Sequence, residues 1–198
     1  MDKVSIPHIP FMMPTPTVLV GANVKGKPNY MAVGWTGFAN VSPPMLTVAI
    51  GQKKYTNSGI IENGTFSVNV PSTKHVIETD YCGIVSGSKV DKSTMFEAFY
   101  GKLGTAPMIK EFPVNIECKL YKSVELPNRM IHIGEIVDVF IDKDCMTEDR
   151  PDIKKIDPII LTFPKWIYWS MGEVIGRGFF IGKEYKNTAD VSPVIAQK

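Results

Sequence analysis

The sequence predicts a mainly β fold, a barrel or a sandwich, in one domain that spans residues 1–198. Short runs rich in β-branched and aromatic residues recur at intervals of about ten residues. Turn-forming residues bound each run, and segments with a helical pattern are few and short. Many short strands with few helices favour an all-β architecture over a parallel α/β sheet.

Six short runs are expected to form strands, because most of them alternate between apolar and polar residues: residues 17–24, 30–33, 45–50, 65–70, 114–121 and 131–141. Residues 25–29 are expected to form the turn between the first two runs, and the Asn-Gly pair at 63–64 is a turn signal before the fourth. Short helices are expected at residues 57–62 and 73–81, and a mixed segment at residues 89–100.

The charge balance is near neutral, with 22 Lys and Arg against 20 Asp and Glu and a net charge of +2. Because a dedicated nucleic-acid binder is strongly basic, no nucleic-acid partner is expected. Residues 28–52 carry no charge, but their prolines, glycines and hydroxyl side chains argue against a membrane span. We therefore expect protein or ligand to bury this segment, and we expect no membrane partner.

The N-terminal segment is interrupted by prolines and lacks the apolar run of a signal peptide. Cys82, Cys118 and Cys145 form no CxxC pair and are expected to be free thiols. Both observations predict a cytoplasmic protein.

Motifs of several enzyme classes are absent from the sequence. It contains no GxGxxG, GxxxxGK[ST], HExxH or GxSxG, and its three histidines, His8, His75 and His132, stand at unrelated positions. We therefore expect no βαβ dinucleotide fold, no hydrolase and no metal site.

Two segments combine residues suited to a bound ligand. In residues 32–44, small residues surround Trp35, so backbone amides can approach a flat ligand that the indole covers; the alternative is a bulged core strand with a Pro-Pro exit. Residues 51–58 combine lysines, hydroxyls and a helix start, which suits a phosphate; the alternative is a solvated loop with a helix cap.

A third segment, residues 80–92, contains Cys82 without a nearby histidine or CxxC partner, so a buried and inert thiol is expected. Within it, Ser86-Gly87 is typical of a turn and Asp91-Lys92 of a surface ion pair.

In this order the three segments resemble the flavin reductase-like family of FMN-binding split barrels, and most closely its flavoredoxin branch. The resemblance covers residues 12–182. It rests on five strings: G-W-x-G-x-x-N-x-S-P-P at 34–44, K-x-x-T at 53–56, I-I-E-N-G-T-F-S-V-N-V-P at 60–71, C-G-x-x-S-G-x-x-x-D-K at 82–92 and H-I-G-E-I-V at 132–137.

The resemblance implies a homodimer of six-stranded, Greek-key split β-barrels with a few short helices and with FMN near the subunit interface. The residues that would line the isoalloxazine and the ribityl chain are Trp35, Thr36, Asn40 and Ser42. The 5′-phosphate would be held by Gly51, Lys53, Lys54 and Thr56, and the site would be closed by Ser86, Gly87 and Lys92. No side chain is nominated as catalytic, because a flavin itself carries the redox chemistry.

The resemblance further implies an FMN-dependent oxidoreductase that passes hydride or electrons from NAD(P)H to a flavin, ferric or protein acceptor. The alternative is a flavoredoxin-type carrier with protein redox partners and little direct NAD(P)H activity. Many family reductases place a nicotinamide-facing His five residues before the Gly of the I-G-E strand, whereas here Arg129 stands there and His132 lies two residues before Gly134. This departure favours the carrier. A small-ligand binding barrel, in which the strings are structural, is the third interpretation.

Overall fold

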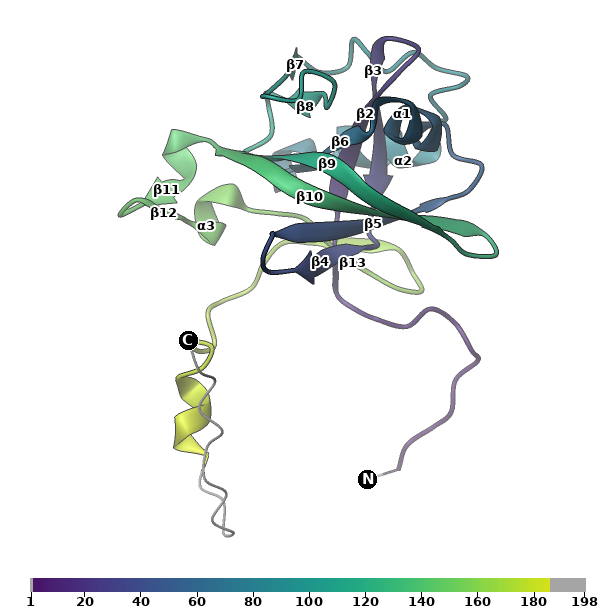
Figure 1. The fold of residues 1–198 in the computed structure, drawn as a ribbon. Coiled ribbons are helices and arrows are strands. Elements are labelled where there is room, and N and C mark those ends of the chain that lie inside the picture. Colours follow the sequence, from purple (N-terminus) through teal and green to yellow (C-terminus); the bar gives the residue numbers. More distant parts are fainter. Residues whose placement is uncertain (1, 186–198) are drawn as a thin grey trace.

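The computed structural model describes residues 2–185. Its main sheet has seven antiparallel strands in the order β3-β2-β6-β9-β10-β5-β4 (Figure 1). These strands are β2 (Val18–Val24), β3 (Lys27–Val33), β4 (Thr36–Asn40), β5 (Met45–Gly51), β6 (Thr65–Val70), β9 (Val114–Glu125) and β10 (Arg129–Ile141). The prediction of a mainly β fold is confirmed.

All six predicted strands are present, and the seventh strand, β4, lies in residues 32–44, which are interpreted above as a ligand-contacting segment or a bulged strand. Four of the five β4 residues are exposed, so no alternation of buried and exposed side chains marks this strand in the sequence. β3 begins at Lys27 rather than at residue 30. The reason is that Lys25 and Gly26, both with positive φ, complete the turn in two residues.

Helices within residues 2–185 are short: α1 (Thr56–Asn63), α2 (Val76–Ile84) and α3 (Ile153–Ile156), with 3-10 turns at Thr73–His75, Lys143–Cys145 and Ile181–Glu184. Both predicted helices are confirmed, although the second begins as a 3-10 turn. Residues 89–100 contain no helix and only the strand β7 (Ala98–Phe99), which pairs with β8 (Met108–Ile109). Among the described residues 2–185, no helix is long and apolar enough to cross a membrane.

Small strands complete the fold. β13 (Ile160–Thr162) pairs with both β1 (Thr15–Pro16) and β14 (Ile167–Trp169). A further pair consists of β11 (Met146–Thr147) and β12 (Arg150–Pro151).

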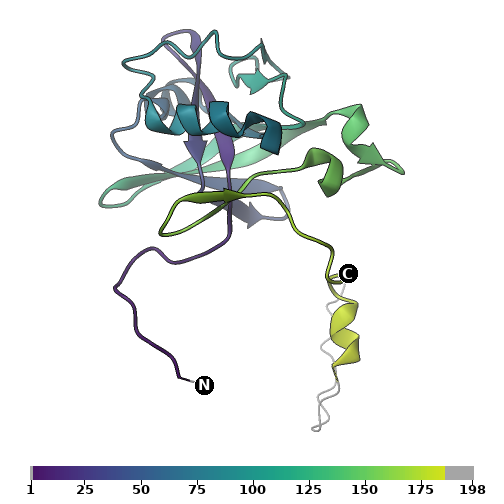
Figure 2. The same cartoon turned by 180° about the vertical axis from the view of Figure 1, so that it is seen from behind.

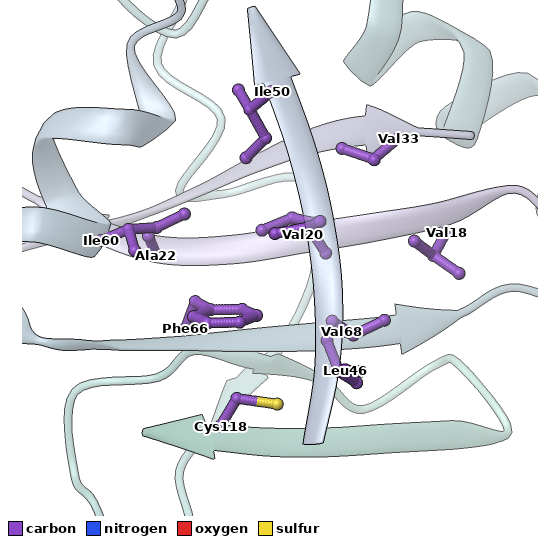
Figure 3. Packing of buried hydrophobic residues seen from close by; sticks show 11 residues of the cluster. Val18, Val20, Ala22, Val33, Leu46, Ile50, Ile60, Phe66, Val68 and Cys118 are labelled. Carbon is purple, nitrogen blue, oxygen red and sulfur yellow. The ribbon is translucent and has the colours of Figure 1, made fainter. Parts of the chain in front are cut away.

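The barrel core lies between β5 and the strands that it crosses, β2, β3 and β6 (Figure 3). β3 and β5 come close without forming a ladder, so the barrel is split at this point. The core residues are Val18, Val20, Ala22, Val33, Leu46, Val48, Ile50, Ile60, Phe66, Val68 and Cys118. Burial of each larger side chain of this kind contributes roughly 1.5–3 kcal/mol.

A second cluster packs beneath α2, which covers the outer face of β2 and β3 (Figure 2). The ring of Phe96 meets Tyr30 of β3 and Phe112 edge to face, with centroid distances of 5.5 and 5.4 Å. Cys82 of α2 and Leu19 of β2 complete the contact. This cluster holds the segment that follows α2 against β3.

The charge-free segment 28–52 is only partly buried. The strands at its two ends enter the core, but residues 37–44 are exposed at the β4–β5 turn, where Phe38 is 95 % and Val41 91 % exposed. The expectation that the whole segment is buried is therefore not met within one chain. Residues 2–14 and 170–183 are exposed as well, and both segments extend away from the barrel (Figures 1 and 2).

Gly59 lets α1 lie directly against β2, because a Cβ at position 59 would overlap the backbone carbonyl of Asn23. Alanine is the better helix former by roughly 1 kcal/mol, so helix propensity alone favours Gly59→Ala. We expect the opposite, a loss of about 1–3 kcal/mol in unfolding free energy by urea denaturation, since the overlapping atoms belong to the backbone. Glu62→Ala, at an exposed position of the same helix, should stay within about 0.5 kcal/mol of the wild type. A Gly59→Ala protein as stable as the wild type would contradict this packing.

Candidate functional site

Two of the residues predicted to hold a phosphate, Lys54 and Thr56, meet the three predicted to close the site in a narrow cleft beside the N-terminus of α1. Three segments that lie far apart in the sequence meet there: the end of the β5–α1 connection, the loop that follows α2, and β3. The cleft is lined by Lys54, Thr56, Ser86, Gly87 and Lys92, together with Met31, Tyr55, Cys82, Gly83 and Val85. The structure thus brings five of the predicted residues together.

Gly87 allows the close approach of two of these segments. Any Cβ at position 87 would overlap the side-chain amide of Asn29 and crowd the ring of Tyr55. Asn29 is itself buried, and its Nδ2 donates a hydrogen bond of 2.9 Å to Thr56 Oγ1. Because the Thr56 oxygen accepts this bond, the Thr56 hydroxyl keeps its own hydrogen for an acceptor in the cleft.

Lys92 is buried at the cleft, with only 3 % of its surface exposed. Its Nζ donates to the carbonyl oxygens of Tyr30 and Cys82, both at 2.9 Å, which leaves one N–H bond for a ligand. Burial lowers the pKa of Lys92. The expectation of an Asp91-Lys92 surface ion pair is wrong, because Asp91 pairs instead with Lys27 at 2.8 Å.

The turn that carries Lys53 and Lys54 is held from within by Asn57. The Lys54 N–H donates to the Gly51 carbonyl oxygen at 2.9 Å, which closes the turn. Asn57 Nδ2 then donates to two carbonyl oxygens of the turn, those of Gly51 at 2.8 Å and Gln52 at 2.9 Å. The geometry of the turn therefore depends on the Asn57 side chain.

His132 of β10 orients Asn57. Its Nε2 lies 2.9 Å from Asn57 Oδ1, and its Nδ1 lies 2.9 Å from Ser123 Oγ. Since an amide oxygen only accepts, Nε2 carries the proton and Ser123 donates to Nδ1. Burial lowers the pKa of His132 to about 4, so the ring is neutral at pH 7. His132 is fully buried and acts behind the turn as a positioning residue.

Trp35 lies beside the same end of β5. Its carbonyl oxygen accepts from the Ala49 N–H at 2.8 Å, and Gly51, two residues further, pairs with Arg129 of β10. Two strand residues span roughly 7 Å, so Trp35 adjoins the turn. The Arg129 guanidinium lies over the indole ring, 4.1 Å from its centroid. Thr36 lines a hollow with Trp35.

Six of the eleven predicted residues do not line the cleft: Trp35, Thr36 and Gly51, which lie beside it, and Asn40, Ser42 and Lys53. Asn40 and Ser42 are exposed at the β4–β5 turn, where Asn40 Nδ2 donates to the Pro43 carbonyl oxygen at 2.9 Å. Lys53 is exposed on its turn and does not line the cleft.

The cysteines are free, as expected, and all three are buried. Burial raises the pKa of the Cys82 thiol to about 11, so the thiol is protonated and unreactive at neutral pH. Among the side chains of residues 2–183 and 185, no group of three or more His, Cys, Asp and Glu could hold a metal ion.

No sequence pattern marks Asn29 as the partner of Thr56, or His132 as the partner of Asn57. The paired residues are 27 and 75 positions apart, so no local pattern joins them. A polar residue among apolar neighbours, as His132 is among Met130, Ile131 and Ile133, was the available signal.

Residues 11–159 match the family model described as a flavin reductase like domain. The chain therefore belongs to the flavin reductase-like family. A protein of Archaeoglobus fulgidus is 35 % identical over 148 residues, which is 72 % of this chain and 81 % of that protein.

Two solved structures share this fold at substantial identity. A flavoredoxin from Methanosarcina acetivorans is 48 % identical with a TM-score of 0.90, over 92 % of this chain and 98 % of that one. A flavoredoxin of Desulfovibrio vulgaris (Miyazaki F) is 36 % identical with a TM-score of 0.85, over 91 % of this chain and 100 % of that one.

The low pKa of His132 couples stability to pH. A histidine titrates near 6.5 in the unfolded chain and His132 at about 4 in the fold, so between these values only the unfolded chain binds the proton. We expect the wild type to lose about 2 kcal/mol of unfolding free energy through this group between pH 7 and pH 5. His132→Gln, which keeps an N–H donor for Asn57, should lose that part of the pH dependence. Identical urea-unfolding profiles of the two proteins at both pH values would count against the buried neutral ring.

Proposed function

We propose that this protein binds FMN and transfers electrons through it. The observation that carries the proposal is the convergence of Lys54, Thr56, Ser86, Gly87 and Lys92 on one cleft. Family membership and the similarity to two proteins named flavoredoxin support it. FMN supplies the redox chemistry, while the chain binds, orients and shields it.

The cleft offers a phosphate what it requires. Lys54 contributes an exposed positive charge at the rim, and the buried Lys92 has an N–H bond to spare. The Thr56 hydroxyl is left free to donate by Asn29. Charge-assisted hydrogen bonds of this kind are the strong ones, and the N-terminus of α1 adds its partial positive charge.

The isoalloxazine ring is proposed to extend from this cleft toward Trp35 and Thr36. Both residues adjoin the end of β5 from which the phosphate turn starts, so a molecule of flavin dimensions reaches both places. The indole offers a flat apolar surface to a conjugated ring.

NAD(P)H is the first candidate electron donor, with a flavin, a ferric compound or a protein as acceptor. A protein donor, as for a flavoredoxin-type carrier, is the second candidate. Arg129 favours a protein donor. Its guanidinium covers the Trp35 indole, and it stands at the position where many reductases of the family have a histidine.

We further propose a homodimer in which a second copy covers the β4–β5 turn. The exposed side chains of Phe38 and Val41 lie there in a segment without charge. Asn40 and Ser42, which stay apart from the cleft in one chain, belong to the same turn. A flavin near the subunit interface would therefore be within reach of these two residues.

Lys54→Ala and Thr56→Val are each expected to weaken FMN binding by about 10- to 100-fold, the loss of one charge-assisted hydrogen bond. Riboflavin, which has no phosphate, should bind both variants as it binds the wild type. Fluorescence titration of the FMN-free protein measures both ligands. Lys122→Ala, at an exposed position of β9, is the matched control and should leave both affinities unchanged. Equal affinity of the wild type for FMN and riboflavin would exclude a phosphate site.

The donor is identified by reduction of the FMN-loaded protein without oxygen. Loss of the flavin absorbance on mixing with NADH or NADPH within seconds is expected of a reductase. Loss only with a reduced ferredoxin-type protein is expected of a carrier. A colourless protein that also fails to take up added FMN would exclude both the reductase and the carrier.

A further inference from the structure

A second hollow lies on the side of Trp35 that carries Arg129. It has a volume of about 360 Å³, and its walls include Pro10, Trp35, Asn128, Arg129, Phe163 and Trp166. None of the residues assigned to the phosphate lines this hollow. It is therefore a different place from the proposed phosphate cleft.

The walls of this hollow are suited to a flat apolar body. Phe163 and Trp166 meet edge to face with their centroids 4.4 Å apart, and Trp35 is the third aromatic side chain of the lining. Pro10, from the N-terminal arm, adds a further apolar surface. Aromatic walls of this kind hold a single ring by stacking and by edge contacts.

Arg129 is the charged residue among those that line the hollow. Among the side chains of residues 2–183 and 185, no carboxylate lies within 4.0 Å of its guanidinium and no acceptor takes a hydrogen bond from it. The guanidinium is permanently charged, and its central carbon lies over the Trp35 ring. Its N–H bonds lie in the guanidinium plane, so they remain available at the edge.

We propose that this hollow binds a small planar organic anion, an aromatic ring that carries a carboxylate. The ring packs among Trp35, Phe163 and Trp166, and the carboxylate accepts a two-pronged hydrogen bond from Arg129. A neutral ring leaves the cation unpaired, and a positively charged ring such as an oxidised nicotinamide is repelled by it.

The bound anion lies close to the proposed flavin. Arg129 pairs through its backbone with Gly51, the first residue of the phosphate turn, and through its side chain with Trp35. The hollow is thus a specificity site at the edge of the redox centre. It selects for negative charge in the molecules that reach that edge.

Isothermal titration calorimetry of the FMN-loaded full chain with benzoate and with its neutral isostere benzamide tests the proposal. We expect benzoate to bind at least tenfold more tightly than benzamide. Arg129→Gln should abolish that preference, and Arg129→Lys should keep part of it. Arg150→Gln, at an exposed position of β12, should leave it intact. Circular dichroism checks that each variant is folded.

Three results would overturn the proposal. The first is equal affinity for benzoate and benzamide, or no benzoate binding at millimolar concentration. The second is a preference for benzoate that survives in Arg129→Gln. The third is that benzoate binds the FMN-free protein but no longer binds once FMN is added, since the flavin ring would then occupy this hollow. FMN binding is read separately from the flavin absorbance, so failure of the proposed function is distinguished from failure of the anion site.

Discussion

A buried hydrogen bond between His132 and Asn57 is the interaction on which the rest of the site depends. It joins the long β9–β10 hairpin to the N-terminal turn of α1, and Asn57 passes the constraint to two carbonyl oxygens of the preceding turn. Both side chains are buried, so removal of either one leaves the other as an unpaired buried polar group. This lowers the free energy of unfolding by about 1–3 kcal/mol. The same hydrogen bonds therefore stabilise the fold and fix the turn that carries Lys54.

Buried polar side chains also fix the other walls of the cleft. Lys92 bridges β3 and the end of α2 through two backbone carbonyl oxygens, and Asn29 joins β3 to α1 through Thr56. Lys92 keeps one N–H bond for a ligand, and the bond from Asn29 leaves the Thr56 hydroxyl free to donate. Such a cleft is preorganised, because its donors need little rearrangement to receive an anion.

Local patterns predicted most of the strands and both main helices, since alternation and turn residues are properties of neighbouring positions. They missed β4, whose exposed side chains show no alternation, and they placed Lys92 on the surface although it is buried. The candidate residues of the cleft followed from residue type and from resemblance. Their supports, Asn29 and His132, are set by tertiary contacts between distant positions that no local pattern records.

The central claim is that the cleft holds the 5′-phosphate of FMN. A crystal structure of the protein with FMN tests it most directly. The account predicts phosphate oxygens within hydrogen-bond distance of Lys54 Nζ, Thr56 Oγ1 and Lys92 Nζ, with Gly51 to Lys54 unmoved. A phosphate bound at Arg129 instead, with the cleft between α1 and the loop after α2 left to solvent, would contradict it.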